Sequence, residues 1–240
     1  MTGRTALITG ANKSIGYETA RQLGRLGYSI WLGSRDAGRG ALAAETLALE
    51  GFDVRGIAID VADGKSVLDA AAIVHAADRK LDVLINNAGI SGSYAAPSEQ
   101  TLSEIEAVYQ TNVFGPIRVT QAFLPLLRAS GKANVVMVSS GLGSLTWLSD
   151  ATHPYHAVNI LAYNSSKTAL NAITLSLAKD LAKDGINVNA ADPGYTKTDF
   201  NNHTGYRTVE QAADTIVWLA DQDASEPTGG FFFERAVAPW

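Results

Sequence analysis

The amino-acid sequence predicts a doubly wound α/β fold, in which helices cover both faces of a parallel sheet. Strand and helix patterns alternate along all 240 residues without a linker between them. The strand segments are apolar throughout, as expected for parallel strands that are buried on both faces. With 46% hydrophobic residues, a chain of this length can build one large core. We therefore expect a single domain over residues 1–240.

The first strand and the first helix enclose a glycine turn. An apolar strand pattern at 5–9 runs into the turn, and an amphipathic helix follows at 15–27. Gly10 permits a tight turn, and Gly16 permits a close approach of the helix to the strand. Backbone N–H groups at such a helix N-terminus can bind a phosphate or pyrophosphate. An ordinary strand-to-helix turn is the alternative interpretation of this segment alone.

The rest of the chain repeats the same alternation, which brings the expected number of strands to about seven. The further strands are expected at 29–34, 54–59, 82–86, 134–139, 186–191 and 229–233. The helices between and after them are expected at 38–50, 64–78, 103–129, 162–183 and 208–222. Three of the later strands end in polar or small residues: Asn86-Asn87-Ala88-Gly89, Ser139-Ser140-Gly141 and Asp192-Pro193-Gly194. Ligands bind outside the carboxyl ends of strands in such sheets, so these segments and the glycine turn predict one crevice.

The helix at 162–183 carries a phenol and an ammonium on one face. Tyr163 and Lys167 are four residues apart, a spacing that places both side chains on the same side of a helix. A neighbouring positive charge favours the phenolate, so we expect Lys167 to lower the pKa of Tyr163 below about 10. The pair could then transfer a proton. The five-residue pattern alone is common in helices, and the surrounding motifs decide its interpretation.

In their order along the chain, these motifs resemble those of the short-chain dehydrogenase/reductases. The resemblance covers nearly the whole sequence and rests on Thr9-Gly10 to Gly16, Asn86-Asn87-Ala88-Gly89, Asn112, Ser140, Tyr163 to Lys167, and Pro193-Gly194. The segments at 9–13 and 33–36 and the C-terminal Pro239-Trp240 are most similar to the carbonyl reductase type. The resemblance implies a Rossmann-type sheet and an NADP(H)-dependent oxidoreductase that reversibly reduces a ketone or aldehyde to an alcohol.

The resemblance also implies a catalytic set of Asn112, Ser140, Tyr163 and Lys167. Tyr163 would donate the proton, Lys167 would also hold the nicotinamide ribose, and Ser140 would hydrogen-bond the carbonyl oxygen. Ser140 is preferred to Ser139 because the active serine of the family is the second of such a pair. Asn112 would retain a water in a proton relay, although a helix asparagine bonded to local backbone is the alternative. Tyr155 lacks a cation four residues on, so we expect a substrate-loop or surface residue there.

The end of the second predicted strand favours NADP(H) over NAD. Arg35 lies where a ribose 2′-phosphate would bind, and Lys13 in the glycine turn adds a second cation. The alternative is an NAD enzyme in which Asp36 binds the ribose. Ser14 replaces the middle glycine of the family turn, so its Cβ would crowd the pyrophosphate or strain the backbone, unless its hydroxyl caps the helix or binds phosphate. The expected cofactor-binding residues are Gly10, Asn12, Lys13, Ser14, Ile15, Gly16, Arg35, Asp60, Val61, Asn87, Ala88, Gly89, Tyr163, Lys167, Pro193, Gly194, Thr196 and Thr198.

Composition excludes several other classes of function. A net charge of −5 without a basic stripe argues against a nucleic-acid partner, and no apolar segment predicts a signal peptide or membrane span. Cysteine is absent, which excludes disulfides and fits a cytoplasmic protein. The four histidines show no zinc-ligand spacing, so we expect no metal. The apolar faces of the helices at 103–129 and 162–183 suggest a homodimer or homotetramer.

The predicted partner is a small carbonyl or alcohol substrate. We expect the segments at 141–161 and 195–207 to form substrate loops, because long connections at strand ends usually carry function. Three alternatives remain from the sequence: an NAD-dependent alcohol dehydrogenase, a non-catalytic dinucleotide sensor, and an oligomeric scaffold with relict motifs. The complete catalytic set argues against the sensor, and Ser14 is the feature in its favour.

Overall fold

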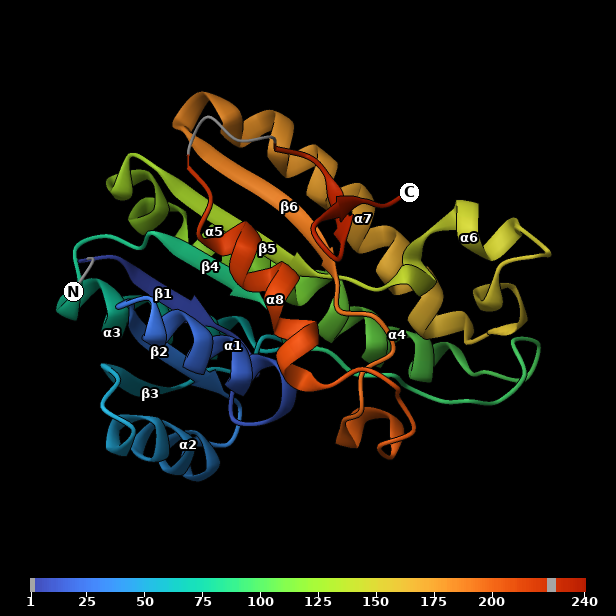
Figure 1. The fold of residues 1–240 in the computed structure, drawn as a ribbon, viewed down its shortest axis with the longest axis horizontal. Helices are drawn as coiled ribbons and strands as arrows, with labels where there is room; N and C mark the ends of the chain where they lie inside the picture. Colours follow the sequence, from blue (N-terminus) through green and yellow to red (C-terminus); the bar gives the residue numbers. More distant parts are fainter. Residues whose placement is uncertain (1–2, 224–227) are drawn as a thin grey trace.

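The computed structural model describes residues 3–223 and 228–240, and these residues form one eight-stranded sheet. The strand order is β3-β2-β1-β4-β5-β6-β7-β8, and every neighbouring pair is parallel except β7 and β8. The strands are β1 (Thr5–Ile8), β2 (Ser29–Ser34), β3 (Val54–Ala58), β4 (Val83–Asn86), β5 (Ala133–Val138), β6 (Ile186–Asp192), β7 (Phe231–Phe233) and β8 (Ala236–Val237). The prediction of a doubly wound parallel sheet is confirmed (Figure 1).

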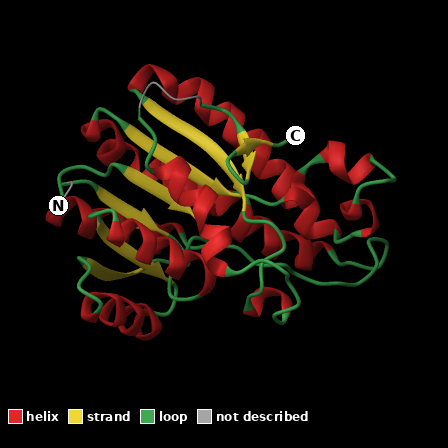
Figure 2. Cartoon of the chain, viewed as in Figure 1, coloured by secondary structure: helices red, strands yellow, loops and turns green. Residues whose placement is uncertain are grey.

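Helices lie on both faces of this sheet (Figure 2). The α-helices are α1 (Ser14–Arg25), α2 (Ala37–Leu49), α3 (Gly64–Ala77), α4 (Leu102–Asn112), α5 (Phe114–Ser130), α6 (Leu145–Ser149), α7 (Leu161–Leu181) and α8 (Val209–Ala220). Short 3₁₀ turns are η1 (Gly141–Gly143), η2 (Pro154–Ala157), η3 (Ala182–Asp184) and η4 (Asp199–Asn201). Among the helices within 3–223 and 228–240, none combines the length and apolarity needed to cross a membrane.

Two hydrophobic clusters fill the space between the sheet and its helices. One cluster packs α3, α5 and α7 against one face, and the other packs α1, α2 and α8 against the opposite face. Successive residues of a strand point to opposite faces of the sheet and so belong to alternate clusters: Leu7 is in the first cluster, and Ile8 is in the second. Because both faces are buried, the strands contain few polar side chains except near their ends.

Two elements differ from the prediction. The helix expected at 103–129 is divided into α4 and α5 at Val113, which has φ −115° and ψ −62°. Pro116 explains the break, because it has no N–H to donate to the Asn112 carbonyl and its ring would crowd that carbonyl. In the first turn of α5 the same proline is tolerated. The eighth strand, β8, pairs only two residues with β7, which is too short for a periodicity signal.

Candidate active site

The carboxyl ends of β1, β4, β5 and β6 lie side by side in the sheet, so the four segments that were predicted to form one crevice are neighbours. Hydrogen bonds of Thr9 and Asn87 connect the end of β1 to the end of β4. The Thr9 Oγ1 accepts hydrogen bonds from the Asn87 and Ala88 backbone N–H groups at 3.0 and 3.1 Å. In return, the Asn87 Nδ2 donates to the carbonyl oxygens of Thr9 and Gly10 at 2.9 and 3.0 Å. Asn87 thus fixes the glycine turn to the end of β4.

The glycine turn is packed so tightly that two of its positions have no space for a side chain. Gly10 has φ +63°, and a Cβ there would lie 2.9 Å from the Ala88 Cα. A Cβ at Gly16 would lie 2.5 Å from the Asn87 Nδ2. The side chain of the N-cap residue, Lys13, makes no capping hydrogen bond to α1, so the first N–H groups of the helix can bind an anion. The turn therefore fits the pyrophosphate of a dinucleotide.

Ser14 adopts the left-handed backbone conformation that its glycine counterpart would adopt without strain. Its φ is +52°, in a region that costs a residue with a Cβ about 1–2 kcal/mol. The sequence analysis expected the Ser14 Cβ either to crowd the pyrophosphate or to strain the backbone, and the backbone strain is present. Lys13, not Ser14, is the N-cap residue of α1, and Ser14 is the first residue of the helix.

We expect Ser14→Gly to raise the free energy of unfolding by up to about 1 kcal/mol, because the relief of strain exceeds the added entropy of the unfolded chain. NADPH affinity should change less than tenfold, since the strain is the same with and without the cofactor. Thermal unfolding and fluorescence titration measure the two effects. Ser14→Ala is the matched control, because it removes the hydroxyl and keeps the Cβ. A larger gain in affinity for Ser14→Gly alone would mean that the Cβ crowds the cofactor.

The end of β2 separates the roles of Arg35 and Asp36. Asp36 caps α2, and its carboxylate accepts bonds from the backbone N–H and the Nε of Arg39, both at 2.9 Å. These bonds hold the pKa of Asp36 below its usual value. Arg35 is exposed and forms no hydrogen bond or ion pair with any described residue. The carboxylate that an NAD enzyme would use is engaged, whereas the guanidinium is available.

Lys13, the second cation that the sequence analysis assigned to the cofactor phosphate, is paired with an acidic side chain. Its Nζ donates to the Asp199 Oδ2 at 2.8 Å and joins the glycine turn to η4. The remaining turn residues, Asn12 and Ile15, are half-buried. An ammonium has three donors, so the bond to Asp199 leaves two for a phosphate oxygen.

Lys167 and Tyr163 lie together on α7, as their spacing predicts. Lys167 is only 4% exposed, and its Nζ donates to the Val138 carbonyl oxygen at 2.8 Å. The same Nζ lies 5.6 Å from the centroid of the Tyr163 ring. Burial lowers the pKa of Lys167 to about 8, against the opposing effect of the Asp192 carboxylate.

The pKa of Tyr163 is shifted in the direction opposite to the prediction. Burial raises it above the ordinary phenol value, and a hydrogen bond with the Ser140 side chain only partly offsets this. The positive charge of Lys167 was expected to dominate. Its Nζ is instead held by Val138, and the loss of hydration around the phenol has the larger effect.

We expect Lys167→Met to increase stability while it abolishes turnover. The unfolded chain holds this proton up to pH 10.5, whereas the folded chain loses it near pH 8. The cost of the buried charge is therefore fully present below pH 8 and disappears as the pH rises toward 10.5. At pH 7 the variant should gain about 2 kcal/mol in the free energy of unfolding, and the gain should shrink by pH 10. Chemical denaturation across this range measures it, and a less stable variant at pH 7 would contradict the account.

The adjacent serines point to different environments. Ser139 is buried, and its Oγ donates to the Asn171 Oδ1 at 2.6 Å. Ser140 is half-buried at the end of β5, where its Oγ accepts from the Leu142 N–H at 3.2 Å and its side chain hydrogen-bonds Tyr163. Of the two hydroxyls, Ser140 is the one beside the phenol.

Asn112 is completely buried at the end of α4, and its side chain is fully bonded. Its Oδ1 accepts from the Ile90 N–H, and its Nδ2 donates to the Ile90 carbonyl oxygen, both at 2.9 Å. The Nδ2 also donates to the Ser166 Oγ at 3.1 Å. The side chain therefore joins α4, α7 and the segment after β4, which matches the alternative of an asparagine bonded to backbone.

Several predicted cofactor neighbours have bonds within their own loops. Asp60 accepts from the Ala62 N–H at 3.0 Å, whereas Asp63, not Asp60, caps α3. Val61 is buried against α5 beside Gly115. Thr196 and Thr198 are buried, and the Thr196 Oγ1 donates to the carbonyl oxygens of Pro193 and Gly194 at 3.1 Å. Ala88 and Gly89 line the end of β4, where a Cβ on Gly89 would lie 3.8 Å from the Lys167 Nζ.

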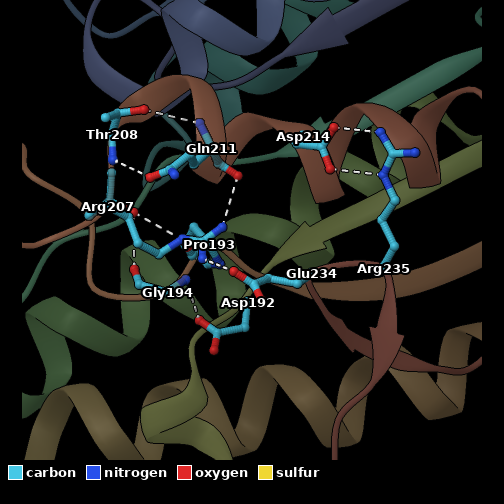
Figure 3. A network of polar contacts seen from close by, with 10 residues as sticks. Asp192, Pro193, Gly194, Arg207, Thr208, Gln211, Asp214, Glu234 and Arg235 are labelled. Carbon is cyan, nitrogen blue, oxygen red and sulfur yellow. Dashed lines mark hydrogen bonds and ion pairs between the residues drawn. The ribbon is translucent and has the colours of Figure 1, made fainter.

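Asp192 is a buried carboxylate of this site to which the sequence analysis gave no role. Asp192 is 3% exposed at the end of β6. Its Oδ1 accepts a hydrogen bond from the Gly194 N–H at 2.8 Å (Figure 3). Its Oδ2 has no hydrogen-bond partner among the described residues. Burial raises the pKa of Asp192, although the charges of Arg207 and Lys167 oppose the rise. Arg207 is held in turn by Glu234 and by the Gln211 carbonyl oxygen (Figure 3). The sequence signal for this residue was an acidic side chain directly before Pro193-Gly194, at the end of a predicted strand.

The segment at 141–161 places an aromatic group beside this end of the sheet and projects from the body of the molecule (Figure 1). Trp147 and His153 stack with ring centroids 5.1 Å apart, and Tyr155 packs edge-on against both. A Cβ at Gly141 would collide with the Tyr155 ring. Burial raises the pKa of Tyr155 as it raises that of Tyr163, so the pKa does not distinguish the two phenols. Within the described ranges, no group of three metal-ligating side chains comes together.

Comparison with known proteins places this geometry in a family. The family model described as short chain dehydrogenase matches residues 4–207. The chain is 36% identical to a (+)-neomenthol dehydrogenase of Arabidopsis thaliana, over 98% of this chain and 97% of that one. It is 30% identical to carbonyl reductase (NADPH) 3 of Mus musculus, over 99% and 98% of the two chains. An NADPH-bound carbonyl reductase from chicken fatty liver has a TM-score of 0.87 at 28% identity, over 99% of each chain. The protein belongs to the short-chain dehydrogenase family.

Proposed function

We propose that the protein is an oxidoreductase that uses NADP(H) to reduce a ketone or aldehyde to an alcohol, reversibly. The observation that carries this proposal is the meeting of Ser140, Tyr163 and Lys167 at the strand ends, beside the uncapped N-terminus of α1. The carbonyl reductase relatives support the same reaction. The segments at 141–161 and 195–207 would border the substrate. The cytoplasmic location and the homodimer or homotetramer stay predictions.

NADPH supplies the hydride when it is bound, and the chain supplies the proton and the orientation. The Ser140 hydroxyl donates to the substrate carbonyl oxygen as negative charge develops there. Tyr163 donates its proton to that oxygen, and the raised pKa of its phenol keeps the proton in place at neutral pH until then. Lys167 would hold the ribose of the bound cofactor, and its positive charge would stabilise the phenolate that remains after proton transfer.

The choice of NADP(H) rests on the end of β2. Asp36 is engaged by Arg39, so it does not present a carboxylate to a ribose hydroxyl, whereas Arg35 is exposed without a protein partner among the described residues. A guanidinium can make two parallel bonds to a phosphate. Lys13 adds a second cation from the glycine turn.

We expect Arg35→Ala to lower kcat/KM for NADPH at least tenfold relative to kcat/KM for NADH, because hydrogen bonds to charged groups contribute about 1.5–3 kcal/mol. The ratio of kcat/KM for the two cofactors measures the effect. Arg79→Ala is the matched control, since Arg79 is an exposed arginine that precedes β4, at the opposite end of the sheet from the predicted crevice. Equal use of the two cofactors by the wild type, or an equal loss in both variants, would contradict the assignment of Arg35.

The function itself is tested with the purified protein, NADPH and a panel of ketones, aldehydes and quinones. Loss of NADPH absorbance that depends on the carbonyl compound is the expected result. Tight NADPH binding without turnover on any compound would favour the dinucleotide sensor instead.

A further inference from the structure

The loop at 195–207 is a compact unit whose ends are joined. The Lys197 N–H donates to the Arg207 carbonyl oxygen at 2.9 Å, and the Tyr206 N–H donates to the Tyr195 carbonyl oxygen at 3.0 Å. The 3₁₀ turn η4 lies between these ends and carries Phe200. Figure 1 shows the loop in orange at the carboxyl end of the sheet, apart from the helices that cover the two faces.

An ion pair fastens this loop to the glycine turn. The Asp199 Oδ2 accepts from the Lys13 Nζ at 2.8 Å, and the Asp199 Oδ1 lies 2.9 Å from the His203 Nε2. Hydrogen bonding to Lys13 holds the pKa of Asp199 below its usual value, so the carboxylate stays charged at neutral pH. The contact spans 186 residues of sequence and joins the cofactor turn to the loop after β6.

The residue next to Asp199 reaches the reactive phenol. The Phe200 ring centroid lies 5.6 Å from the Tyr163 ring centroid, with the ring planes inclined by 57°. Phe200 remains 43% exposed, so part of an apolar ring faces solvent directly beside the proton donor. Tyr94, which is 65% exposed, lies close enough to affect the pKa of Tyr163. An apolar ligand would cover this aromatic surface and remove it from water.

We propose that Phe200 selects uncharged ketones that carry an apolar ring, and that Asp199 is a positioning residue that holds Phe200 through Lys13. This inference rests on the proposed function and names a substrate class for it. An aromatic side chain packs best on flat or ring-shaped apolar groups. A charged group placed against the Phe200 ring would lose hydration without gaining a hydrogen bond from that ring, which disfavours ionised substrates. Lys13 can keep its bond to Asp199 when a phosphate is present, because the ammonium has further donors.

The test compares two seven-carbon ketones, 3-methylcyclohexanone and 2-heptanone, as substrates with NADPH. Phe200→Ala should lower the ring-to-chain ratio of kcat/KM roughly tenfold, mainly through KM. Phe200→Leu, which keeps an apolar side chain, should lose less. Asp199→Ala should lower the ratio about two- to fivefold, as expected for an exposed ion pair, and Asp199→Asn should recover part of the loss.

The double variant separates positioning from a general effect. In the Phe200→Ala background, Asp199→Ala should cause no further change in the ratio, since Asp199 acts through Phe200. Without cofactor, Asp199→Ala should also speed hydrogen exchange of the amides at 195–207. Asp214→Ala is the control, because Asp214 lies on α8, its surface ion pair is with Arg235 between β7 and β8, and its loss should change neither quantity.

Each failure has a distinct reading. A wild type that reduces neither ketone, nor any compound of the carbonyl panel, overturns the proposed function and the role of Phe200 with it. Wild-type turnover with an unchanged ratio in Phe200→Ala overturns the role of Phe200 alone. Equal losses from Asp199→Ala in both backgrounds, or unchanged exchange of the loop amides, overturn the positioning role of Asp199.

Discussion

Tyr163→Phe should lower kcat for ketone reduction by about 10²–10⁴-fold, because it removes the proposed proton donor and keeps the ring. NADPH should still bind, since the glycine turn and Arg35 are unchanged. The fold should survive because the ring of phenylalanine fills the same space and keeps its packing against Phe200. Steady-state kinetics and fluorescence titration of NADPH measure the two properties on the same variant.

Tyr155→Phe is the internal control for this experiment. Tyr155 has no lysine four residues on, and it lies in the aromatic group around Trp147. Its loss should leave kcat within a few-fold of the wild type and change KM if the loop borders the substrate. A loss below tenfold at Tyr163, or a larger loss at Tyr155, would show that the wrong tyrosine has been assigned.

Ser140→Ala should lower kcat by about 10²–10³-fold, the usual effect of removing one donor to a developing oxyanion. The serine also hydrogen-bonds Tyr163, so the variant should raise the apparent pKa of the phenol seen in alcohol oxidation. The alkaline rise of that reaction should then move to higher pH. A pH profile of kcat in both directions measures the two effects.

Ser139→Ala is the matched control, because it removes the same hydroxyl one residue earlier. Ser139 donates to Asn171 in the core, so its loss should reduce stability by about 1–3 kcal/mol through the unpaired amide oxygen. Turnover per folded molecule should change much less than in Ser140→Ala. The reverse pattern, with Ser139 controlling kcat, would contradict the assignment.

The sequence predicted the sheet, and it predicted that Tyr163 and Lys167 share a helix face, because both features depend on local signals. Apolar strand runs and the punctuation after them determine which strand ends meet, and the spacing of Tyr163 and Lys167 determines their shared helix face. The preference for Ser140 over Ser139 depended on resemblance, and the structure adds a physical difference in burial between them. The break at Val113 had a signal in Pro116 that the long periodic pattern masked.

Other features depend on tertiary contacts that no local pattern reveals. The pKa of Tyr163 depends on the loss of hydration around its half-buried ring and on the bond from Lys167 to Val138. The partner of Lys13 is Asp199, which is remote in sequence and approaches only when the loop after β6 folds back. The same folding brings Phe200 to Tyr163, which the residue types alone could not indicate.

Transfer of a labelled hydride tests the central claim most directly. The protein is incubated with a ketone and NADPH that carries deuterium at both C4 positions, and the alcohol is analysed by mass spectrometry. The account predicts an alcohol with one deuterium on the carbinol carbon, formed by the wild type and nearly absent with Tyr163→Phe. NADPH binding without any labelled alcohol, across the whole panel of carbonyl compounds, would contradict it.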